Sequence, residues 1–312
     1  MDALPDRDDV ERAARTIAGR VRRTPLLEAP ALGAGVVVKA ELLQHAGSFK
    51  ARGVTSRLAA LGSDERSRGV VGVSAGNHAM ALAWGATREG IDSLLVTFRG
   101  ASPYKLSRTR ELGATVEVVD GDPAAAFARM EEIVAETGRV VVHPFDDPLV
   151  VAGQGTVGLE IVEDADGLDT VVVPAGGGGL VAGITAAVAP AGVRVIAVEP
   201  EGSAALGEAL AHGAPVPVVP HTRAGGLDAP YAGDIAVGLC QRYRVEAVTV
   251  SDEEIEAAMR RVYADVKLAC EPAAAAGVAA VLRDRDSFGR VAIVVSGGNV
   301  AADTASAILA GR

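Results

Sequence analysis

The sequence has few aromatic residues and no excess of positive charge. Aromatic residues make up 3% of the 312 residues, so the bases of a nucleic acid would find few side chains to stack on. Lys and Arg number 30 against 40 Asp and Glu, which sets the formal net charge at −10. An acidic chain lacks the basic surface that nucleic acids and anionic membranes attract. We therefore expect no nucleic acid and no membrane among its partners.

Cysteine is also scarce, and the first residues do not have the pattern of a signal peptide. Cys240 and Cys270 cannot build a disulfide scaffold, and they are compatible with a reducing compartment. The first 23 residues alternate in charge and contain no apolar core of a signal peptide. Residues 170–189 carry no charge, but Pro174 and the glycines at 176–179 divide them, which favours a strand, a turn and a helix over a membrane span. These features predict a cytoplasmic protein.

Short β-branched runs alternate along the chain with Ala-rich helical stretches. The runs at 170–174 and 291–295 are almost continuously apolar, as strands of a parallel sheet are when both faces are covered. The alternation predicts an α/β fold with right-handed crossovers, and the length suggests two lobes. Residues 213–233, rich in Pro and Gly, predict an irregular loop near a site or an interface.

Four short segments carry residues that chemistry could use. The first is Gly47-Ser48-Phe49-Lys50, just before a predicted helix. On the surface Lys50 would be an ordinary charge, whereas in a pocket its neutral amine could form a Schiff base with an aldehyde cofactor. The second segment, residues 74–78 with the sequence Ser-Ala-Gly-Asn-His, opens a predicted helix. It is either an ordinary N-cap or a set of donors suited to a carboxylate.

The third segment is a run of four glycines and Leu180, at residues 176–180, after an apolar strand. Backbone N–H groups in such a turn converge on an anion, and the dipole of the following helix supports them. The run lacks the Gly-Lys-Ser/Thr of a P-loop, and it matches the dinucleotide pattern poorly, although Glu199 could end the next strand. The fourth segment, Ser296-Gly297-Gly298-Asn299, places a hydroxyl at the carboxyl edge of the predicted sheet.

Together the segments make up the inventory of a pyridoxal 5'-phosphate (PLP) site that acts on an amino acid. At this point the chain resembles the fold-type II PLP enzymes, in the branch of threonine/serine dehydratases and serine racemases. The segments that carry the resemblance, in order and spacing, are 48–50, 74–78, 152–156 (Ala-Gly-Gln-Gly-Thr), 176–180, 271–272 (Glu-Pro) and 296–299.

The resemblance implies a fold, a domain organisation and an assembly. The fold would be the two-domain α/β fold of the tryptophan synthase β-like type, with largely parallel sheets flanked by helices. Residues 1–62 plus 147–312 would form the large, PLP-binding domain, and residues 63–146 a small domain that closes over the substrate. A homodimer is expected on the same ground.

The resemblance also implies roles for single residues. Lys50 would bond to the cofactor aldehyde and then act as the base at Cα of the substrate. The residues implied to bind the cofactor are Phe49, Lys50, Asn77, Gly176, Gly177, Gly178, Gly179, Leu180 and Ser296. Those implied to bind the substrate are Ser74, Ala75, Asn77, His78 and Gln154.

Two departures from the family pattern sharpen the prediction. Serine racemases of this family carry a second serine where this chain has Ala75, and a methyl group cannot move a proton, so elimination is favoured over racemisation. The family's divalent-cation site would need a second carboxylate where this chain has Ala205, which leaves Glu199 and Ser203 as a weak metal site. We therefore predict no bound metal.

The sequence predicts a PLP-dependent dehydratase, or ammonia-lyase, that eliminates water from a hydroxy amino acid. The neutral Ser296 hydroxyl beside the pyridine nitrogen favours prompt loss of a β-leaving group over transamination. L-Threonine or L-serine is the expected substrate, and 3-hydroxyaspartate, phenylserine and serine racemisation remain alternatives. Two other classes stay open: a noncatalytic PLP-binding protein, and a nucleotide-binding oxidoreductase that uses the glycine-rich turn.

Overall fold

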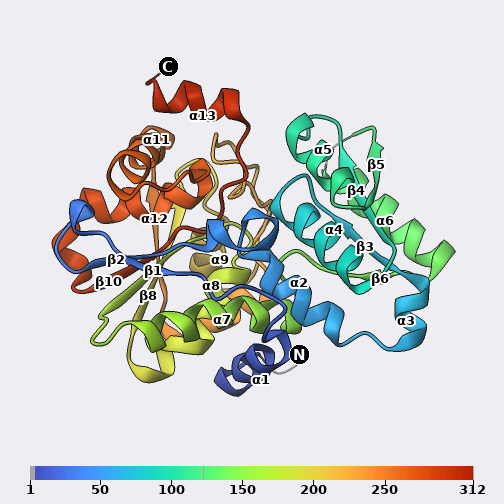
Figure 1. Ribbon diagram of the computed structural model, residues 1–312, viewed down its shortest axis with the longest axis horizontal. Helices are drawn as coiled ribbons and strands as arrows, with labels where there is room; N and C mark the ends of the chain where they lie inside the picture. The colour runs from blue at the N-terminus through green and yellow to red at the C-terminus, as the bar shows by residue number, and fades with distance from the viewer. Residues whose placement is uncertain (1–3, 122, 312) are drawn as a thin grey trace.

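The protein is described here by a computed structural model that covers residues 4–121 and 123–311. Two groups of elements lie side by side, each around its own sheet (Figure 1). One sheet has six strands in the order β1-β2-β10-β7-β8-β9, and the other has four in the order β5-β4-β3-β6. The predicted α/β class with mainly parallel sheets is confirmed, since only β1 pairs antiparallel.

The six-stranded sheet forms the centre of the larger group. Its strands are β1 (Leu26–Glu28), β2 (Val36–Lys39), β7 (Thr170–Pro174), β8 (Arg194–Pro200), β9 (Glu246–Val250) and β10 (Val291–Val294). Every residue of β2, β7 and β10 is buried. Alternate residues serve opposite helix layers: Val172 packs in one apolar cluster, while Val171 and Val173 pack in the other. Burial of both faces explains the continuous apolar runs in the sequence.

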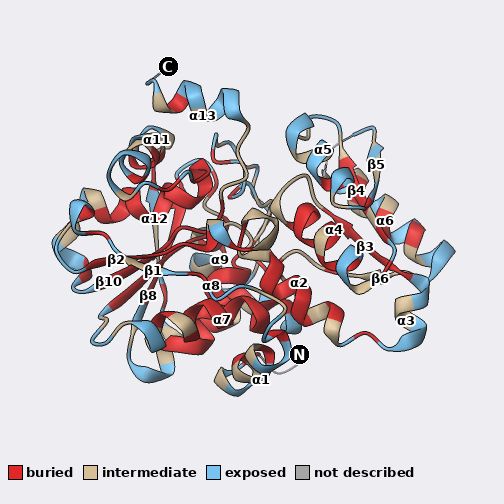
Figure 2. Ribbon diagram, viewed as in Figure 1, coloured by how far each residue is buried: buried red, intermediate tan, exposed pale blue. Residues whose placement is uncertain are grey.

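Helices cover both faces of this sheet. Five of them are α1 (Arg7–Ile17), α7 (Pro148–Asp164), α8 (Gly179–Val188), α9 (Ala205–His212) and α10 (Asp234–Tyr243). The C-terminal part of the chain adds α11 (Asp252–Arg261), α12 (Pro272–Arg283) and α13 (Ala302–Leu309). Short helical turns occur at Pro30–Leu32, Glu41–Leu43, His45–Gly47, Ala189–Ala191, Val262–Val266 and Arg285–Phe288. Buried residues concentrate in the central strands and in α7 and α8 (Figure 2).

The four-stranded sheet is smaller and less covered. It contains β3 (Val70–Val73), β4 (Ser93–Phe98), β5 (Thr115–Val119) and β6 (Val140–Val141), with helices α3 (Ser63–Arg68), α4 (Asn77–Glu89), α5 (Pro103–Glu111) and α6 (Pro123–Thr137). All of β3 is buried, but no residue of β5 is.

Helix α2 (Lys50–Ala59) connects the two groups. Val54 and Leu58 belong to the apolar cluster of the small sheet, and a Cβ at Gly85 in α4 would lie 2.9 Å from Val54. Arg52, on another side of the same helix, is buried among Glu41 and Glu160 of the larger group. The predicted boundaries at residues 62/63 and 146/147 remain a prediction, because α2 contributes to both cores.

The stretch 170–189 forms β7 and α8, as the strand-turn-helix interpretation predicted. In the part of the chain that the structure describes, no helix is both long enough and apolar enough to cross a membrane. The alternation pattern did not predict the edge strand β1 or the helices α3, α7, α9 and α10. The missed helix α7 is rich in Gly and Val, which are weak helix formers outside a packed interior.

Candidate active site

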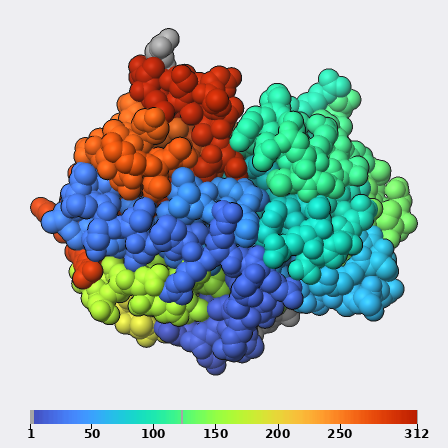
Figure 3. All heavy atoms as spheres, viewed as in Figure 1, coloured from blue at the N-terminus to red at the C-terminus, as the bar shows by residue number. Residues whose placement is uncertain are grey.

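A cavity of about 220 Å³ lies where the two sheets meet. Its walls come from the carboxyl ends of β3, β4, β7 and β10, the starts of α2, α4, α8 and α12, and two loops. The lining residues are Phe49, Lys50, Val73–His78, Phe98, Phe127, Pro144, Phe145, Pro174, Gly176–Leu180, Gly225–Pro230, Glu271, Ala273 and Ser296. The molecular surface is hollowed between the C-terminal segment and the small-sheet group (Figure 3).

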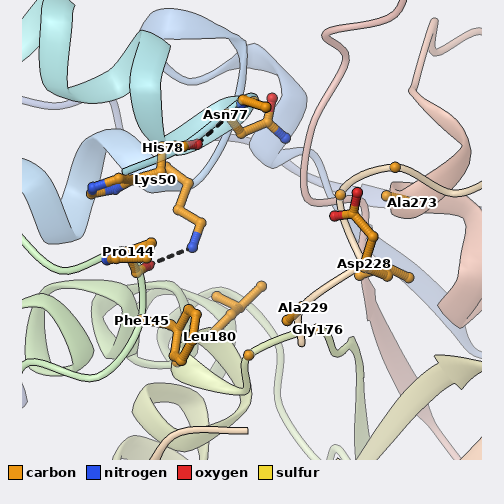
Figure 4. Close-up of a pocket in the computed structure, with 18 of the residues that line it drawn as sticks. Lys50, Asn77, His78, Pro144, Phe145, Gly176, Leu180, Asp228, Ala229 and Ala273 are labelled. Carbon is orange, nitrogen blue, oxygen red and sulfur yellow. Dashed lines mark hydrogen bonds between the residues drawn. The ribbon is translucent and has the colours of Figure 1, made fainter. Parts of the chain in front are cut away.

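Lys50 is the first residue of α2, and its side chain extends into this cavity (Figure 4). The Nζ donates a hydrogen bond of 2.6 Å to the carbonyl oxygen of Pro144. Burial lowers the pKa of Lys50 to about 8, because the protein environment solvates an ammonium less well than water does. About a tenth of this amine is therefore neutral at pH 7, far more than for an ordinary lysine, and the neutral form is the nucleophile.

The chain before Lys50 is held in one conformation by several contacts. Ala46 has a φ of 54° and Gly47 a φ of 72°. A Cβ on Gly47 would lie 2.4 Å from Oδ1 of Asn299. The Nδ2 of Asn299 donates a hydrogen bond of 2.8 Å to the carbonyl oxygen of Ala46. The backbone N–H of Phe49 donates 3.1 Å to the carbonyl of Ser296. Contacts of this kind keep a strained backbone in place at functional sites, and here they position the lysine.

Residues 74–77 form a turn that opens α4 into the cavity. The backbone N–H of Gly76 donates 3.1 Å to the Oγ of Ser74, and α4 begins at Asn77. The first N–H groups of a helix have no partner within it, and they carry partial positive charge. The turn is thus suited to an anion such as a carboxylate, as the sequence predicted.

The His78 side chain is bonded to the backbone, and contact between His78 and the substrate stays a prediction. Its Nε2 donates 2.8 Å to the carbonyl of Val142, and burial lowers its pKa to about 3, so the ring is neutral. The other nitrogen, Nδ1, is then an acceptor, and it is buried without a partner. In this arrangement the His78 ring has no donor left for a substrate carboxylate, whereas the backbone N–H of the residue, in the first turn of α4, remains suited to one. The bond from the ring to Val142 fixes α4 against the residue that follows β6.

The glycine-rich turn precedes α8 on the opposite side of the cavity. Gly178 has a φ of +83°, and a Cβ there would lie 2.5 Å from that of Ala236. A Cβ on Gly177 would lie 2.4 Å from the ring of Phe145. Only glycine fits at these two positions, because a Cβ at either would collide with a neighbour and because Gly178 also adopts a left-handed conformation. Its N–H groups and the start of α8 form an anion cradle.

Asn77 joins a polar network that spans the two groups of elements. Its Nδ2 donates to Oε1 of Glu271, and its Oδ1 accepts 2.9 Å from Nδ2 of Asn299. Lys105 of α5 lies with its Nζ 3.4 Å from Oε2 of Glu271. The Glu271 side chain is 3% exposed and that of Lys105 is 13% exposed. The Nδ2 of Asn77 has a second hydrogen, so the predicted bond to a cofactor oxygen stays compatible with this network.

Ser296 follows β10 at the cavity wall and is buried. Its carbonyl receives the N–H of Phe49, whereas no hydrogen bond among the described residues involves its hydroxyl. The hydroxyl is a neutral donor and acceptor at the position where the sequence predicts a partner for a ring nitrogen.

Gln154 does not line the cavity. It lies in α7, where its Oε1 accepts 3.2 Å from the N–H of Gly53 in α2 and its Nε2 is buried without a partner. A Cβ on Gly153 would lie 2.7 Å from Cα of Gly53, and one on Gly183 of α8 would lie 2.5 Å from the nitrogen of Gly155. The Ala-Gly-Gln-Gly-Thr segment therefore serves close packing of helices, and contact between Gln154 and substrate has no support from this geometry.

Glu199 and Ser203, the weak metal candidates, are engaged elsewhere. The carboxylate of Glu199 accepts 2.7 Å and 2.8 Å from the N–H groups of Leu206 and Gly207, at the start of α9. The hydroxyl of Ser203 donates 2.6 Å to the carbonyl of Leu227. Burial raises the pKa of Glu199 to about 7, which weakens it as an anionic ligand at neutral pH. The structure thus gives both residues roles in folding the loops.

Several residues of the cavity were not predicted. Phe98 and Phe127 come from the small-sheet group, and Phe145 follows Pro144 in the connection from β6 to α7. Asp228 belongs to the loop at 213–233 that the sequence marked as near a site, but no single residue of it was named. The signal for Phe98 was its position at the carboxyl end of a parallel strand, where α/β proteins bind ligands.

The residues present fit PLP. An amine of lowered pKa faces the cavity, a glycine turn opposite it can take a phosphate, and an unpaired hydroxyl lies at the carboxyl edge of β10. The same cavity holds a second anion site at residues 74–77 that suits the carboxylate of an amino acid. A dinucleotide would need an acidic residue to bind its ribose. The carboxylate of Glu199 instead accepts hydrogen bonds at the start of α9, so this site does not favour a dinucleotide.

Comparisons with known proteins agree with this geometry. The family described as "Pyridoxal-phosphate dependent enzyme" matches residues 17–297. The chain is 41% identical to the L-threonine ammonia-lyase of Thermotoga maritima over 301 residues, which cover 94% of this chain and 75% of that protein. It is 40% identical to the phenylserine dehydratase of Ralstonia pickettii, with 96% and 95% covered.

Among solved structures, maize serine racemase superposes with a TM-score of 0.92 at 33% identity, covering 97% of this chain and 96% of that one. The match extends over nearly the whole chain, so the two groups of elements are shared with that structure. On the combined ground of geometry and similarity, the chain belongs to the family of pyridoxal-phosphate dependent enzymes.

Proposed function

We propose that this protein is a PLP-dependent dehydratase that converts a β-hydroxy amino acid to a 2-oxo acid and ammonia. The observation that carries the proposal is the Lys50 amine, with its lowered pKa, between a glycine-rich anion cradle and a separate carboxylate-binding turn. The names of the relatives support it, since one is an L-threonine ammonia-lyase and another a phenylserine dehydratase.

The chain's own residues divide the work. PLP supplies an aldehyde that links to amines and a ring that draws electrons from Cα. The Gly176–Gly179 turn and the start of α8 hold the phosphate. The turn at 74–77 holds the substrate carboxylate, which orients the Cα–H bond. Lys50 then takes the proton from Cα as a general base, a role for which a pKa near 8 is suited.

Loss of the β-hydroxyl completes the elimination. One proton leaves Cα and one hydroxide leaves Cβ, so water is lost; hydrolysis of the released enamine consumes one water and yields the 2-oxo acid and ammonia. Ser296 supports this course because a neutral hydroxyl does not keep the ring nitrogen protonated. Ala75 lines the cavity where a racemase would need a proton donor, and its methyl group carries no transferable proton.

The test is an ammonia-release screen on the purified, PLP-loaded enzyme. The panel contains L- and D-serine, L- and D-threonine, phenylserine and 3-hydroxyaspartate, each with and without divalent cation. We expect a yellow protein, bleached by borohydride, that releases ammonia and 2-oxo acid from at least one L-hydroxy amino acid.

Other outcomes separate the remaining classes. A yellow protein that releases no ammonia from any member of the panel would be a noncatalytic PLP binder. A protein that converts L-serine to D-serine faster than it releases ammonia would be a racemase in spite of Ala75. A colourless protein that binds a nicotinamide dinucleotide would be an oxidoreductase.

The proposal extends to the assembly and the compartment. A homodimer and a cytoplasmic location are what the sequence resemblance and the cysteine content support, and the small domain at 63–146 is proposed to close over the substrate. Sedimentation of the PLP-loaded enzyme measures whether it is a homodimer. Small-angle scattering with and without substrate measures whether the small domain closes.

A further inference from the structure

We propose that Asp228 and an apolar wall opposite it restrict the substrate to β-hydroxy amino acids whose β-substituent is uncharged. The inference rests on the proposed dehydratase function and deepens it. It places L-threonine and phenylserine inside the accepted class and 3-hydroxyaspartate outside it. Its basis is the distribution of charge around the cavity.

The loop that carries Asp228 is anchored on both sides. Leu227 is buried, and its carbonyl receives the hydroxyl of Ser203 at 2.6 Å. A Cβ on Gly176 would lie 3.1 Å from Cα of Leu227, so the loop passes directly over the start of the anion cradle. Beyond Asp228, the carbonyl of Pro230 receives the N–H of Val218 at 2.8 Å. The backbone of Asp228 is therefore held at the cavity rim by its neighbours.

The carboxylate of Asp228 forms no ion pair with any residue that the structure describes. The residue is exposed and lines the cavity, and Figure 4 shows its side chain extending from the loop beside Gly176 and Ala273. No hydrogen bond or ion pair among the described residues uses its side chain. A carboxylate that only stabilised the loop would have a backbone N–H or a basic side chain as a partner, as Asp146 and Asp147 have.

Apart from Lys105, whose Nζ would lie 3.8 Å from a Cβ on Gly76, the described residues around the cavity offer little to compensate a second negative charge on the substrate. Its other ionisable lining residues, among those described, are Lys50, His78 and Glu271. His78 is neutral, because burial lowers its pKa to about 3. Glu271 is already paired with Lys105. That leaves the Lys50 amine, which the proposed chemistry uses at Cα.

An apolar wall lies on the small-sheet side. Val73 at the end of β3, Phe98 at the end of β4 and Phe127 of α6 line the cavity. A methyl or aryl substituent gains by burial against such side chains, whereas a carboxylate loses its hydration there. Repulsion by Asp228 and desolvation by this wall therefore act in the same direction against an acidic side chain.

The first experiment compares two substrates in three proteins. The measured quantity is the ratio of kcat/KM for L-threonine to that for L-threo-3-hydroxyaspartate, in the wild type, Asp228→Asn and Asp228→Lys. We expect the ratio to fall by about tenfold in Asp228→Asn, and further in Asp228→Lys, since one unit charge a few ångströms away in a partly solvated site is worth about that much. Added salt should narrow the wild-type ratio, because Asp228 is exposed to solvent.

A matched control removes the same charge elsewhere. Asp166 is exposed beyond the end of α7, and none of the side-chain contacts among the described residues involves it. Asp166→Asn should leave the ratio as it is in the wild type.

A second measurement does not depend on turnover. L-2-Aminobutyrate and L-aspartate both lack the β-hydroxyl, and they differ in whether Cβ carries a methyl group or a carboxylate. Calorimetric titration of the PLP-loaded protein should give weaker binding of L-aspartate in the wild type. The gap between the two dissociation constants should shrink by about tenfold in Asp228→Asn.

The outcomes distinguish this inference from the proposed function. A wild type that dehydrates 3-hydroxyaspartate as efficiently as threonine overturns the inference and leaves the dehydratase function intact. The role assigned to Asp228 is overturned if the wild type and Asp228→Asn have the same kcat/KM ratio and also the same gap between the dissociation constants of the two amino acids. A PLP-loaded protein that turns over neither substrate but binds both amino acids overturns the proposed function, and calorimetry still decides the charge preference.

Discussion

The two sides of the cavity are built differently. The six-stranded side has strands buried on both faces, and it contributes the glycine-rich turn and Ser296. The four-stranded side has two strands, β5 and β6, without a buried residue, and it contributes the turn at 74–77. The first side is therefore suited to hold a permanent cofactor, and the second to take up and release a substrate.

Around the turn at 74–77, few polar contacts among the described residues tie the substrate side to the cofactor side. Glu271 accepts from Asn77 and pairs with Lys105, and Asn299 donates to Asn77. His45 stacks on Trp84 of α4 with ring centroids 4.7 Å apart. Because these contacts are few, they can rearrange when a ligand binds, whereas a sheet that is covered on both faces resists local rearrangement. Changes on the cofactor side should thus affect PLP retention and stability, and changes on the substrate side should affect KM.

The largest loss of turnover is expected from a substitution of Lys50, whose side chain lies in the cavity between the two sides. Lys50→Ala should reduce turnover by at least about 10³-fold, because it removes both the covalent anchor and the general base. Ammonia release measures the loss, and circular dichroism checks that the fold persists. The exposed Lys267 provides the control as Lys267→Gln. Wild-type turnover in Lys50→Ala would contradict the assignment of the base.

A change within the cofactor side should lower both stability and PLP affinity. In Gly177→Ala the new Cβ would collide with the ring of Phe145, at 2.4 Å. Overpacking of this kind costs about 1–3 kcal/mol. Thermal unfolding with and without PLP measures both effects. Gly225→Ala is the matched variant for stability, since a Cβ there would meet nothing within 4 Å. Equal unfolding midpoints for the two variants would disprove the packing argument.

The pH dependence of PLP uptake tests the environment of Lys50. Below its pKa of about 8 the amine is protonated and cannot attack an aldehyde, and above it the amine is neutral. The rate of PLP uptake by the apo-protein should therefore rise about tenfold per pH unit below 8 and level off above it. A rate that still rises steeply between pH 9 and 10 would show an ordinary lysine. Stopped-flow absorbance measures this rate.

The smallest effect is expected from the contact between the two sides. Lys105→Met leaves the buried carboxylate of Glu271 without its cation, so the turn at 74–77 should lose part of its support. We expect KM for the hydroxy amino acid to rise about fivefold with PLP retained. The control is Arg99→Gln, which breaks an ion pair with Asp120 whose side chains are 76% and 79% exposed; exposed pairs contribute little. Loss of PLP from Lys105→Met would contradict the division of labour.

Much of the cofactor side followed from the order of residues in the chain. The strand at 170–174, the glycines at 176–179 and the helix after them occur where they were predicted, because a buried strand and a tight turn leave local patterns. Lys50 and Ser296 were predicted through resemblance to a family, and both line the cavity. Gln154 was carried over in the same way, but its segment packs helices together.

The sequence alone determined the α/β class, the strand-turn-helix around the glycines and the set of residues from which a PLP site could be built. Hydrophobic periodicity and turn chemistry are local, so they can be read along the chain. Only the tertiary structure decided that the His78 ring donates its hydrogen bond to Val142 and that Lys105 pairs with Glu271. It also decided that Asp228 lines the cavity without an ion pair to any described residue. These are contacts between segments far apart in the chain, and their protonation and pairing depend on burial, which no local pattern records.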